Sequence, residues 1–526
     1  MLSANPKVSI FYPGPRSVAY SSLAFFFFRE YLGQAGVSHD GFFLEEGGIT
    51  VEGRAPSPRH TTAILASLPY ELLYPDLARM LSQAGIPVLR GQRGPEDPIV
   101  IVGGPAVTAN PLPVSGMADA VLVGEAEPVI DEILDALSMP GRSSRLRALS
   151  EIKGLYVPEY ANSPVERVYE PDLDKAWYPT RQEVPRGVEP VWGRSFMLET
   201  TRGCSRFCRF CMEGHVFLPK RDRSYGRLRE LLEEGVRESR TGKVSFYSLI
   251  FFDNPASDTI LEHAVSMGLE VSVPSIRAET LTPERAELIA RGGQRTITIA
   301  PETGSCTIAR AVRKPIGREG GVEASRIALE AGIRNIKLYI MTGFPGETEE
   351  DRAETVGMVR DIALMAAKKG GQVRVSLNPL IPKPMTPLQW LGFNAKEAGN
   401  ILAETAKAMR KAGARVSVLD PKIAAVQVIL SRGDEKLSPV IALWSQKGGL
   451  LGSLKAAARE LGVRLEPYIE TWPLSLEPPW HRVVVDKYAK PRWLRRELEI
   501  YMDIVNMRDK TRMAKTACKP ARVLPT

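Results

Sequence analysis

Cysteine is scarce in this chain, which has only five cysteines among 526 residues. Three of the five lie within one short stretch, so they cannot form a disulfide framework. Small secreted domains depend on such frameworks, whereas proteins of a reducing compartment do not. We therefore expect a cytoplasmic protein without structural disulfides.

Long hydrophobic runs are also missing. The most apolar run is Ala24 to Phe28, and Arg29 and Glu30 end it. A membrane-spanning helix needs roughly 20 apolar residues, so we expect no membrane span and interpret this run as a buried helix face. The first seven residues lack the basic and apolar regions of a signal peptide, so we expect none.

Charge is uneven along the chain. The net charge is +8, and residues 487–526 contain eleven Lys and Arg against four Asp and Glu. A basic tail of this kind can contact RNA or another polyanion, or it can be a solvated helix and terminus. No aromatic stacking platform accompanies the charges, so both interpretations stay open. The composition, 44% hydrophobic and 25% charged, is that of a globular protein, and the length suggests two to four domains.

A cysteine loop in the middle of the chain carries the strongest chemical signal. Cys204, Cys208 and Cys211 follow a strand-like apolar run with the spacing Cys-x3-Cys-x2-Cys. A [4Fe–4S] cluster normally takes four cysteines, so three leave one iron open for another ligand. The alternative is a structural zinc site, which would need His215 as its fourth ligand.

These residues resemble the signature of the radical SAM superfamily, Cys-x3-Cys-x-aromatic-Cys, with Phe210 in the aromatic position. The resemblance implies a [4Fe–4S] cluster on the three cysteines, S-adenosylmethionine (SAM) on the open iron and Phe210 near the adenine. It also implies an electron donor such as ferredoxin or flavodoxin. Reductive cleavage of SAM then gives a 5′-deoxyadenosyl radical.

Residues 1–140 alternate between strand and helix patterns, which predicts a doubly wound, Rossmann-like parallel sheet. The expected strands are 8–12, 61–68, 98–102 and 120–123. Glycines just past two of them, Gly103, Gly104 and Gly124, let a ligand approach the backbone.

This pattern resembles the cobalamin-binding domain that often precedes a radical SAM core. The resemblance suggests Gly103, Gly104, Gly124 and Glu125 as cobalamin contacts. The Asp-x-His-x-x-Gly motif that supplies a lower cobalt ligand is absent, and His39 is in the wrong order and position. Bound cobalamin therefore stays an open possibility.

Residues 141–195 have little periodicity and are interpreted as a linker, with a short strand near 154–158. Residues 196–390 repeat strand and helix six times, which predicts a partial (β/α)6 barrel. The expected strands are 196–200, 244–252, 271–275, 296–300, 336–341 and 373–378. Ligands of parallel βα folds lie at the carboxyl ends of the strands.

Candidate SAM contacts lie at these strand ends. Glu302 is suited to the SAM ammonium or ribose hydroxyls. Arg277, which follows Ser275 in the same segment, can meet a carboxylate as a planar fork or form a salt bridge within the barrel. Asp253 stands where many family members have a Gly-Gly-Glu motif, so its role is open.

A glycine turn follows the fifth expected strand. Gly343, Pro345 and Gly346 expose backbone groups that suit the adenine edge. Segments 300–305, 337–347 and 378–387 resemble the subgroup of tRNA methylthiotransferases and the Elongator catalytic subunit. That resemblance implies RNA modification as one function, beside cobalamin-dependent methyl transfer.

Residues 391–526 are expected to form a small α-rich domain that caps the barrel and helps to exclude water. Cys306 is interpreted as a small buried residue, an auxiliary ligand or a radical-handling group, and Cys518 as a cysteine without a partner. The leading hypothesis is a radical SAM enzyme whose substrate is unidentified. A non-catalytic iron–sulfur or zinc protein is the alternative from another class.

Overall fold

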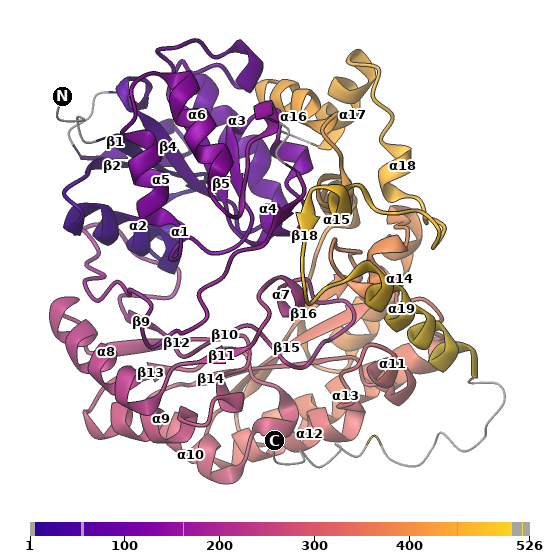
Figure 1. Cartoon of the computed structure of the whole chain (residues 1–526). Helices are drawn as coiled ribbons and strands as arrows, with labels where there is room; N and C mark the ends of the chain where they lie inside the picture. The colour runs from indigo at the N-terminus through magenta and orange to yellow at the C-terminus, as the bar shows by residue number, and fades with distance from the viewer. Residues whose placement is uncertain (1–5, 54–56, 161–162, 450, 508–517, 519–526) are drawn as a thin grey trace.

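The computed structural model describes residues 6–53, 57–160, 163–449, 451–507 and 518. Its N-terminal part, drawn in indigo and purple in Figure 1, contains a seven-stranded sheet. The strand order is β3-β2-β1-β4-β5-β6-β7. The strands are β1 (Lys7–Tyr12), β2 (Ser38–Glu45), β3 (Gly48–Glu52), β4 (Ala63–Ser67), β5 (Ile99–Gly103), β6 (Ala120–Leu122) and β7 (Leu155–Tyr156). The two edge strands, β3 and β7, are antiparallel to their neighbours, and the other pairs are parallel.

Both faces of this sheet are covered, which explains its continuous apolar strands. In β5, Val100 and Val102 pack on one face, and Ile99 and Ile101 pack on the other. The helices of this part are α1 (Arg16–Ala19), α2 (Leu23–Gln34), α3 (Tyr74–Gln83), α4 (Pro105–Ala109), α5 (Ile130–Leu137) and α6 (Arg142–Glu151). The expected doubly wound arrangement is therefore confirmed.

The central part forms a partial barrel from two sheets, with strand orders β13-β12-β9 and β14-β15-β16-β17. A parallel bridge between Ile276 and Ile299 joins them. The strands are β9 (Phe196–Glu199), β12 (Lys243–Tyr247), β13 (Glu270–Ser272), β14 (Thr296–Glu302), β15 (Asn335–Thr342), β16 (Gln372–Pro379) and β17 (Arg415–Val418). The helices that cover the outer face are α8 (Tyr225–Glu238), α9 (Ser257–Ser266), α10 (Pro283–Arg291), α12 (Gly317–Glu330), α13 (Glu349–Lys368) and α14 (Ala395–Lys411).

The barrel has one strand more than expected. The predicted barrel ends at residue 390, and the residues after it are assigned to the C-terminal domain. In the structure, β17 pairs in parallel with β16 and extends the sheet. The local pattern identifies a strand but not the sheet edge to which it adds, because pairing is a tertiary property.

The segment expected as a linker is partly structured. Residues 142–151 form α6, and β7 extends the N-terminal sheet. The C-terminal helices α15 (Pro421–Arg432), α16 (Leu437–Gln446) and α17 (Leu451–Glu460) share a core with α3 of the N-terminal part. The domain boundaries at 140, 195 and 390 stay predictions. Across the described residues, no helix is both long and apolar enough to cross a membrane.

Candidate functional site

The cysteine loop runs from the end of β9, through the short β10 (Thr201–Arg202), to α7 (Glu213–Val216). Cys204 and Cys208 are buried, Cys211 is half-buried, and none of the three is in a disulfide. Burial raises the pKa of the Cys204 and Cys211 thiols. Gly203 begins the loop at φ 83°, where a side chain would strike the backbone oxygen of Phe217. Only glycine fits this turn.

Polar groups surround the cysteine sulfurs. The backbone N–H of Gly214 donates to Cys211 Sγ at 3.4 Å, and Arg277 Nη1 donates to Cys208 Sγ at 3.6 Å. Hydrogen bonds and positive charge at cluster sulfurs are established ways of tuning an iron–sulfur centre. The arrangement therefore suits thiolates bound to metal better than neutral thiols.

The donor set does not match a mononuclear zinc site. Among the described residues, no three Cys, His, Asp or Glu side chains converge as ligands of one metal ion. His215 Nδ1 lies 2.7 Å from the Cys211 carbonyl oxygen, while its ring lies near Phe207 and Trp493. In an iron–sulfur cluster each thiolate binds a different iron, so the sulfurs need not converge on one point. The three cysteines fit that role.

The acidic SAM candidates have cationic partners in this structure. Arg206 Nε and Nη2 donate to Asp253 at 2.6 and 2.7 Å, and Lys314 Nζ donates to Glu302 at 2.7 Å. Glu302 is buried at φ 67°, a left-handed conformation that costs energy in a residue other than glycine. The structure thus brings Glu302 to the strand end in a fixed orientation, and its contact with SAM stays a prediction.

Arg277 lies beside the cysteine loop, as its predicted role requires. Its Nε donates to Glu279 at 2.6 Å, so the salt bridge anticipated as the alternative is present. Its Nη1 reaches Cys208. Ser275 is exposed, and Phe210 packs beside an apolar cluster that includes Phe344. Their predicted SAM contacts are not tested by this geometry.

The glycine turn after β15 is held from two sides. Gly343 N donates to Glu347 at 2.7 Å, and Tyr501 Oη donates to the Pro345 carbonyl oxygen at 2.8 Å. At Gly346, φ is 74° and an added side chain would meet Val505. Tyr501 and Val505 belong to α19 (Pro491–Asn506), so this C-terminal helix covers the turn.

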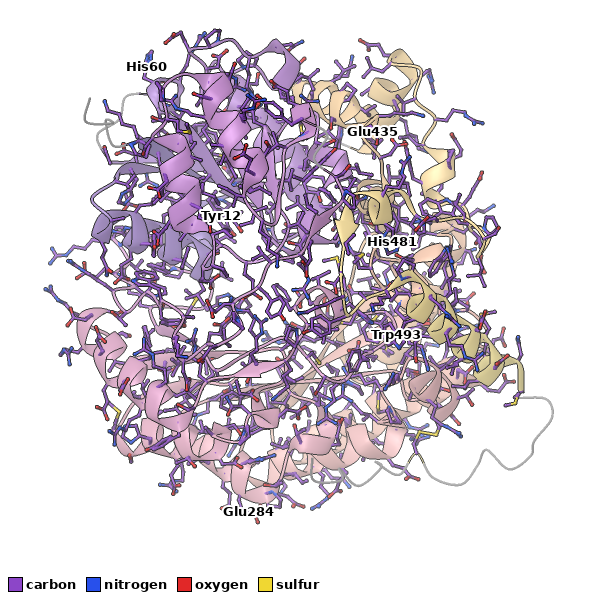
Figure 2. All side chains as sticks on the ribbon, in the orientation of Figure 1. Tyr12, His60, Glu284, Glu435, His481 and Trp493 are labelled. Carbon is purple, nitrogen blue, oxygen red and sulfur yellow. A yellow bond between two sulfur atoms is a disulfide. The ribbon has the colours of Figure 1, made fainter. Side chains whose placement is uncertain are left out.

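The same helix also covers the cysteine loop. Arg209 Nη2 pairs with Glu497 at 2.8 Å, and the ring of Trp493, labelled in Figure 2, lies 5.7 Å from that of Phe207. From the sequence this region is interpreted as a basic tail or a solvated helix, and the cover that the helix gives to the cysteine loop was missed. An apolar i, i+4, i+7 pattern at Leu494, Leu498 and Tyr501 was the available signal.

A cavity of about 470 Å³ lies between the N-terminal sheet and the barrel. Strand-end residues of both parts line it: Gly103, Gly104, Gly124 and Glu125 from the first, and Glu199, Arg202 and Tyr247 from the second. Three aromatic side chains, Phe27, Phe28 and Trp177, add apolar wall. The predicted cobalamin residues and the barrel thus meet at one cavity.

Two of these residues have a structural explanation of their own. A side chain at Gly124 would lie 1.9 Å from the Val168 carbonyl oxygen, so a strand contact requires glycine there. Glu125 is buried and accepts hydrogen bonds from Arg202 at 2.7 Å and from Arg221 at 2.8 Å. Burial alone would raise the pKa of Glu125, but Arg202 and Arg221 together hold it below its usual range.

This ion network joins the two halves of the molecule and was missed from the sequence. Arg202 also pairs with Glu127 at 2.8 Å and with Glu199 at 2.9 Å. Although burial opposes ionisation, Arg202 and then Arg223 lower the pKa of Glu199 to about 2. The pairs lie far apart in sequence, so no local motif reveals them.

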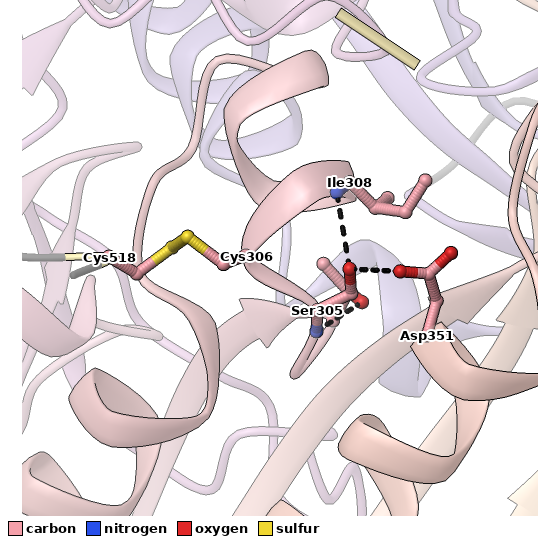
Figure 3. The surroundings of a disulfide bond; sticks show 6 residues. Ser305, Cys306, Ile308, Asp351 and Cys518 are labelled. Atoms are coloured by element: carbon pink, nitrogen blue, oxygen red, sulfur yellow. Dashed lines mark hydrogen bonds between the residues drawn. A yellow bond between two sulfur atoms is a disulfide. The ribbon is translucent and has the colours of Figure 1, made fainter. Parts of the chain in front are cut away.

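A disulfide between Cys306 and Cys518 corrects the expectation that Cys518 has no partner (Figure 3). Cys306 is the first residue of α11 (Cys306–Ala311), which Ser305 caps by accepting a hydrogen bond from Ile308 N at 3.3 Å. Ser305 in turn donates to Asp351. The bond closes 212 residues of separation, which sequence spacing cannot indicate. The rest of the basic tail, 508–517 and 519–526, lies outside the described residues.

Comparisons with known proteins agree with this site. Residues 49–158 match the family described as radical SAM proteins, N-terminal, and residues 198–359 match the radical SAM superfamily. An uncharacterised protein of Methanocaldococcus jannaschii is 28% identical over 458 residues, covering 86% of this chain and 95% of that protein. A tRNA-2-methylthio-N(6)-dimethylallyladenosine synthase of Salinispora arenicola is 28% identical over 244 residues, 43% of this chain and 47% of that protein.

Among solved structures, the radical SAM methyltransferase TsrM of Kitasatospora setae is similar in fold, with a TM-score of 0.52 and 14% identity. The match covers 86% of this chain and all of that one. At this identity the likeness concerns the fold alone. Since both the N-terminal region and the segment that carries the three cysteines match radical SAM families, the chain belongs to the radical SAM superfamily, whose cofactors are a [4Fe–4S] cluster and SAM.

Proposed function

We propose that this protein is a radical SAM methyltransferase that holds cobalamin and substrate in the cavity between its two parts. The observation that supports the proposal most is the shared lining of that cavity. Carboxyl strand ends of the N-terminal sheet and of the barrel face it together. Both are places where parallel α/β folds bind ligands.

Cys204, Cys208 and Cys211 would hold the cluster. When bound, a [4Fe–4S] cluster with one open iron supplies the electron that cleaves SAM. The positively charged guanidinium of Arg277 donates to the Cys208 sulfur and so favours its thiolate form. The covering helix α19 fixes the loop through Glu497.

The residues around the cavity exclude water and define its shape. Most of its lining is apolar, and Phe27, Phe28 and Trp177 contribute to it. A reactive carbon radical needs such shielding, because water and stray hydrogen donors divert it. Tyr247 reaches into the space from the end of β12.

Backbone groups of the cavity, rather than side chains that could ligate cobalt, are the features that suit cobalamin. Gly103 leaves the β5 strand end open, whereas a side chain at Gly104 would lie 2.8 Å from the Leu68 carbonyl oxygen. No histidine is among the residues that line the cavity in the described chain. Cobalamin would therefore be held without a lower histidine ligand. The TsrM structure of similar fold contains cobalamin and a [4Fe–4S] cluster, which supports the same pairing here.

The test is anaerobic reconstitution with iron, sulfide and cobalamin, followed by dithionite or reduced flavodoxin and methyl-labelled SAM. We expect four irons and one cobalamin per chain and the formation of 5′-deoxyadenosine or S-adenosylhomocysteine. The Cys208→Ala variant should lose the cluster, while Cys306→Ala should keep it. SAM cleavage without cobalamin uptake would refute the methyltransferase part alone.

Modification of tRNA is a second candidate, favoured by the 28% identity to the tRNA-2-methylthio-N(6)-dimethylallyladenosine synthase. It requires RNA affinity that falls steeply with salt, because phosphate contacts release counterions. Filter binding of a tRNA pool between low and physiological salt tests it, and salt-independent or absent binding would exclude it.

A further inference from the structure

The strands of the partial barrel have two different faces. Ile336, Leu338 and Ile340 of β15 point outward into the core that the helices cover. The alternate residues, among them Lys337 and Tyr339, lie on the inner face and are only half-buried. Side chains alternate between the faces of a strand, so register decides which inner residues are neighbours.

Three cations stand side by side on this inner face. Lys337 of β15 is in register with Arg374 of β16, and Arg374 is in register with Arg415 of β17. Adjacent strands lie about 4.8 Å apart, so the three side chains begin within about 10 Å. Like charges at such positions repel each other and destabilise the sheet. We call these three residues the basic row.

In the described parts of the chain, no carboxylate forms a salt bridge with the basic row. Lys337 contacts the hydroxyl and ring of Tyr339, and the inner-face acid Glu270 is occupied by Lys243 at 2.8 Å. Cations at helix ends are stabilised by the helix dipole, but these three lie on strands. Arg374 and Arg415 are exposed, so solvent screens part of the repulsion within the row, and an external anion can offset the rest.

Hydroxyl groups follow the basic row toward the carboxyl ends of the strands. Tyr339 is in register with Ser376, and Ser376 with Ser417, so hydroxyl groups lie on the same face two residues further on. The Ser417 hydroxyl donates to the Val375 carbonyl oxygen at 3.2 Å, which leaves Tyr339 and Ser376 as the donors nearest the row. An anion with several oxygens can accept hydrogen bonds from both rows. Lys337 stands five residues before the end of β15, about 16 Å from the side where the cysteine loop lies.

We infer that the basic row binds the phosphate of the substrate. None of the three residues lines the cavity described above, so the substrate extends from the row to that cavity, where the methyl transfer proposed above acts at the strand ends. The inference rests on the proposed function for the reaction, but the anion site itself does not depend on it. The phosphate can belong to a small ester or to a nucleic acid strand, since the recognising chemistry is the same.

Binding of inorganic pyrophosphate to the full-length, cluster-loaded protein tests the inference by calorimetry. We expect one site per chain, and a loss of affinity of about tenfold or more in the variant Lys337→Gln/Arg374→Gln/Arg415→Gln. The matched control Lys396→Gln/Lys407→Gln/Lys422→Gln removes three exposed cations from α14 and α15 and should bind as the wild type does. The variant Lys337→Arg/Arg374→Lys/Arg415→Lys keeps the charge and should retain most of the affinity, which separates binding from folding.

Competition with a labelled twelve-nucleotide RNA then distinguishes the source of the phosphate. RNA that displaces pyrophosphate and depends on the basic row indicates a nucleic acid substrate, and RNA that does not displace it indicates a small ester. Equal pyrophosphate affinity in all variants, or no binding to wild type, would overturn the inference. Measuring SAM cleavage on the same preparation keeps the two proposals apart, because cleavage without pyrophosphate binding refutes only the anion site.

Discussion

Replacing Glu125 by Gln should weaken the ion-pair network between the N-terminal part and the barrel, and so lower the free energy of unfolding. Glu125 belongs to the N-terminal part, whereas its partners Arg202 and Arg221 belong to the cysteine loop and the strand that follows it. All three side chains are at least 86% buried, so solvent cannot replace the lost carboxylate. Arg202 keeps Glu127 and Glu199, but Arg221 keeps only backbone carbonyls.

Removing one partner of a buried ion pair typically costs about 3–5 kcal/mol, because a buried charge is left uncompensated. We expect the lower part of this range for Glu125→Gln, since Arg202 retains two acids. Urea unfolding of the full chain, followed by circular dichroism, measures the change. The matched control is Glu166→Gln, whose pair with Lys153 is largely exposed and should contribute less than about 1 kcal/mol.

A double-mutant cycle separates the pair from the burial of each group. The variants Glu125→Leu, Arg221→Leu and their combination should give a coupling energy of at least about 1 kcal/mol. A loss below about 1 kcal/mol for Glu125→Gln, equal to that of Glu166→Gln, would show that the network does not hold the halves together. The reasoning from burial would then be refuted.

Three further predictions concern pH, redox state and the covering helix. Burial, reinforced by Arg495, lowers the pKa of His481 to about 4. The neutral imidazole therefore contributes stability that is complete above pH 6.5 and is lost as the pH falls toward 4, at most about 3 kcal/mol. In urea titrations at several pH values, the unfolding free energy of His481→Gln should not show this fall between pH 6.5 and 4. Cys518→Ser should lower the unfolding free energy of the oxidised protein by up to about 5 kcal/mol, since its bond closes a 212-residue loop; a reductant should abolish the difference, and no difference before reduction would contradict it. Glu497→Gln leaves the buried Arg209 without its carboxylate, so this variant should lose iron to a chelator faster than the surface control Glu499→Gln does. Equal rates of iron loss would show that the contact between α19 and the cysteine loop does not stabilise the cluster.

Local patterns predicted the elements that depend on neighbouring residues. The cysteine spacing predicted the cluster loop, whose metal-binding role stays a prediction, and short apolar runs identified β1, β4, β5 and β6. The starts of α10 and α13 are equally local: Thr282 caps α10, and Thr348 and Asp351 form a capping box on α13, each within one helical turn.

Properties set by distant residues were not predictable in the same way. β2 begins with the polar sequence Ser-His-Asp-Gly and does not show a strand pattern until Phe42, so it was missed. Glu125 and Glu302 pair with residues that are near them only in the folded chain. Each was expected to be a carboxylate available to a ligand, whereas in the structure each forms a salt bridge within the protein. The disulfide of Cys306 joins it to a residue 212 positions later, which lies beside it only in the folded chain.

The most direct test of the account is whether one iron of the cluster is left open for SAM. Electron paramagnetic resonance and iron and zinc analysis of the reconstituted, dithionite-reduced protein measure this. The account predicts four irons per chain, no stoichiometric zinc, and a cluster signal that changes when SAM is added and disappears in Cys204→Ala. A signal unaffected by SAM, or one zinc per chain in place of iron, would contradict it.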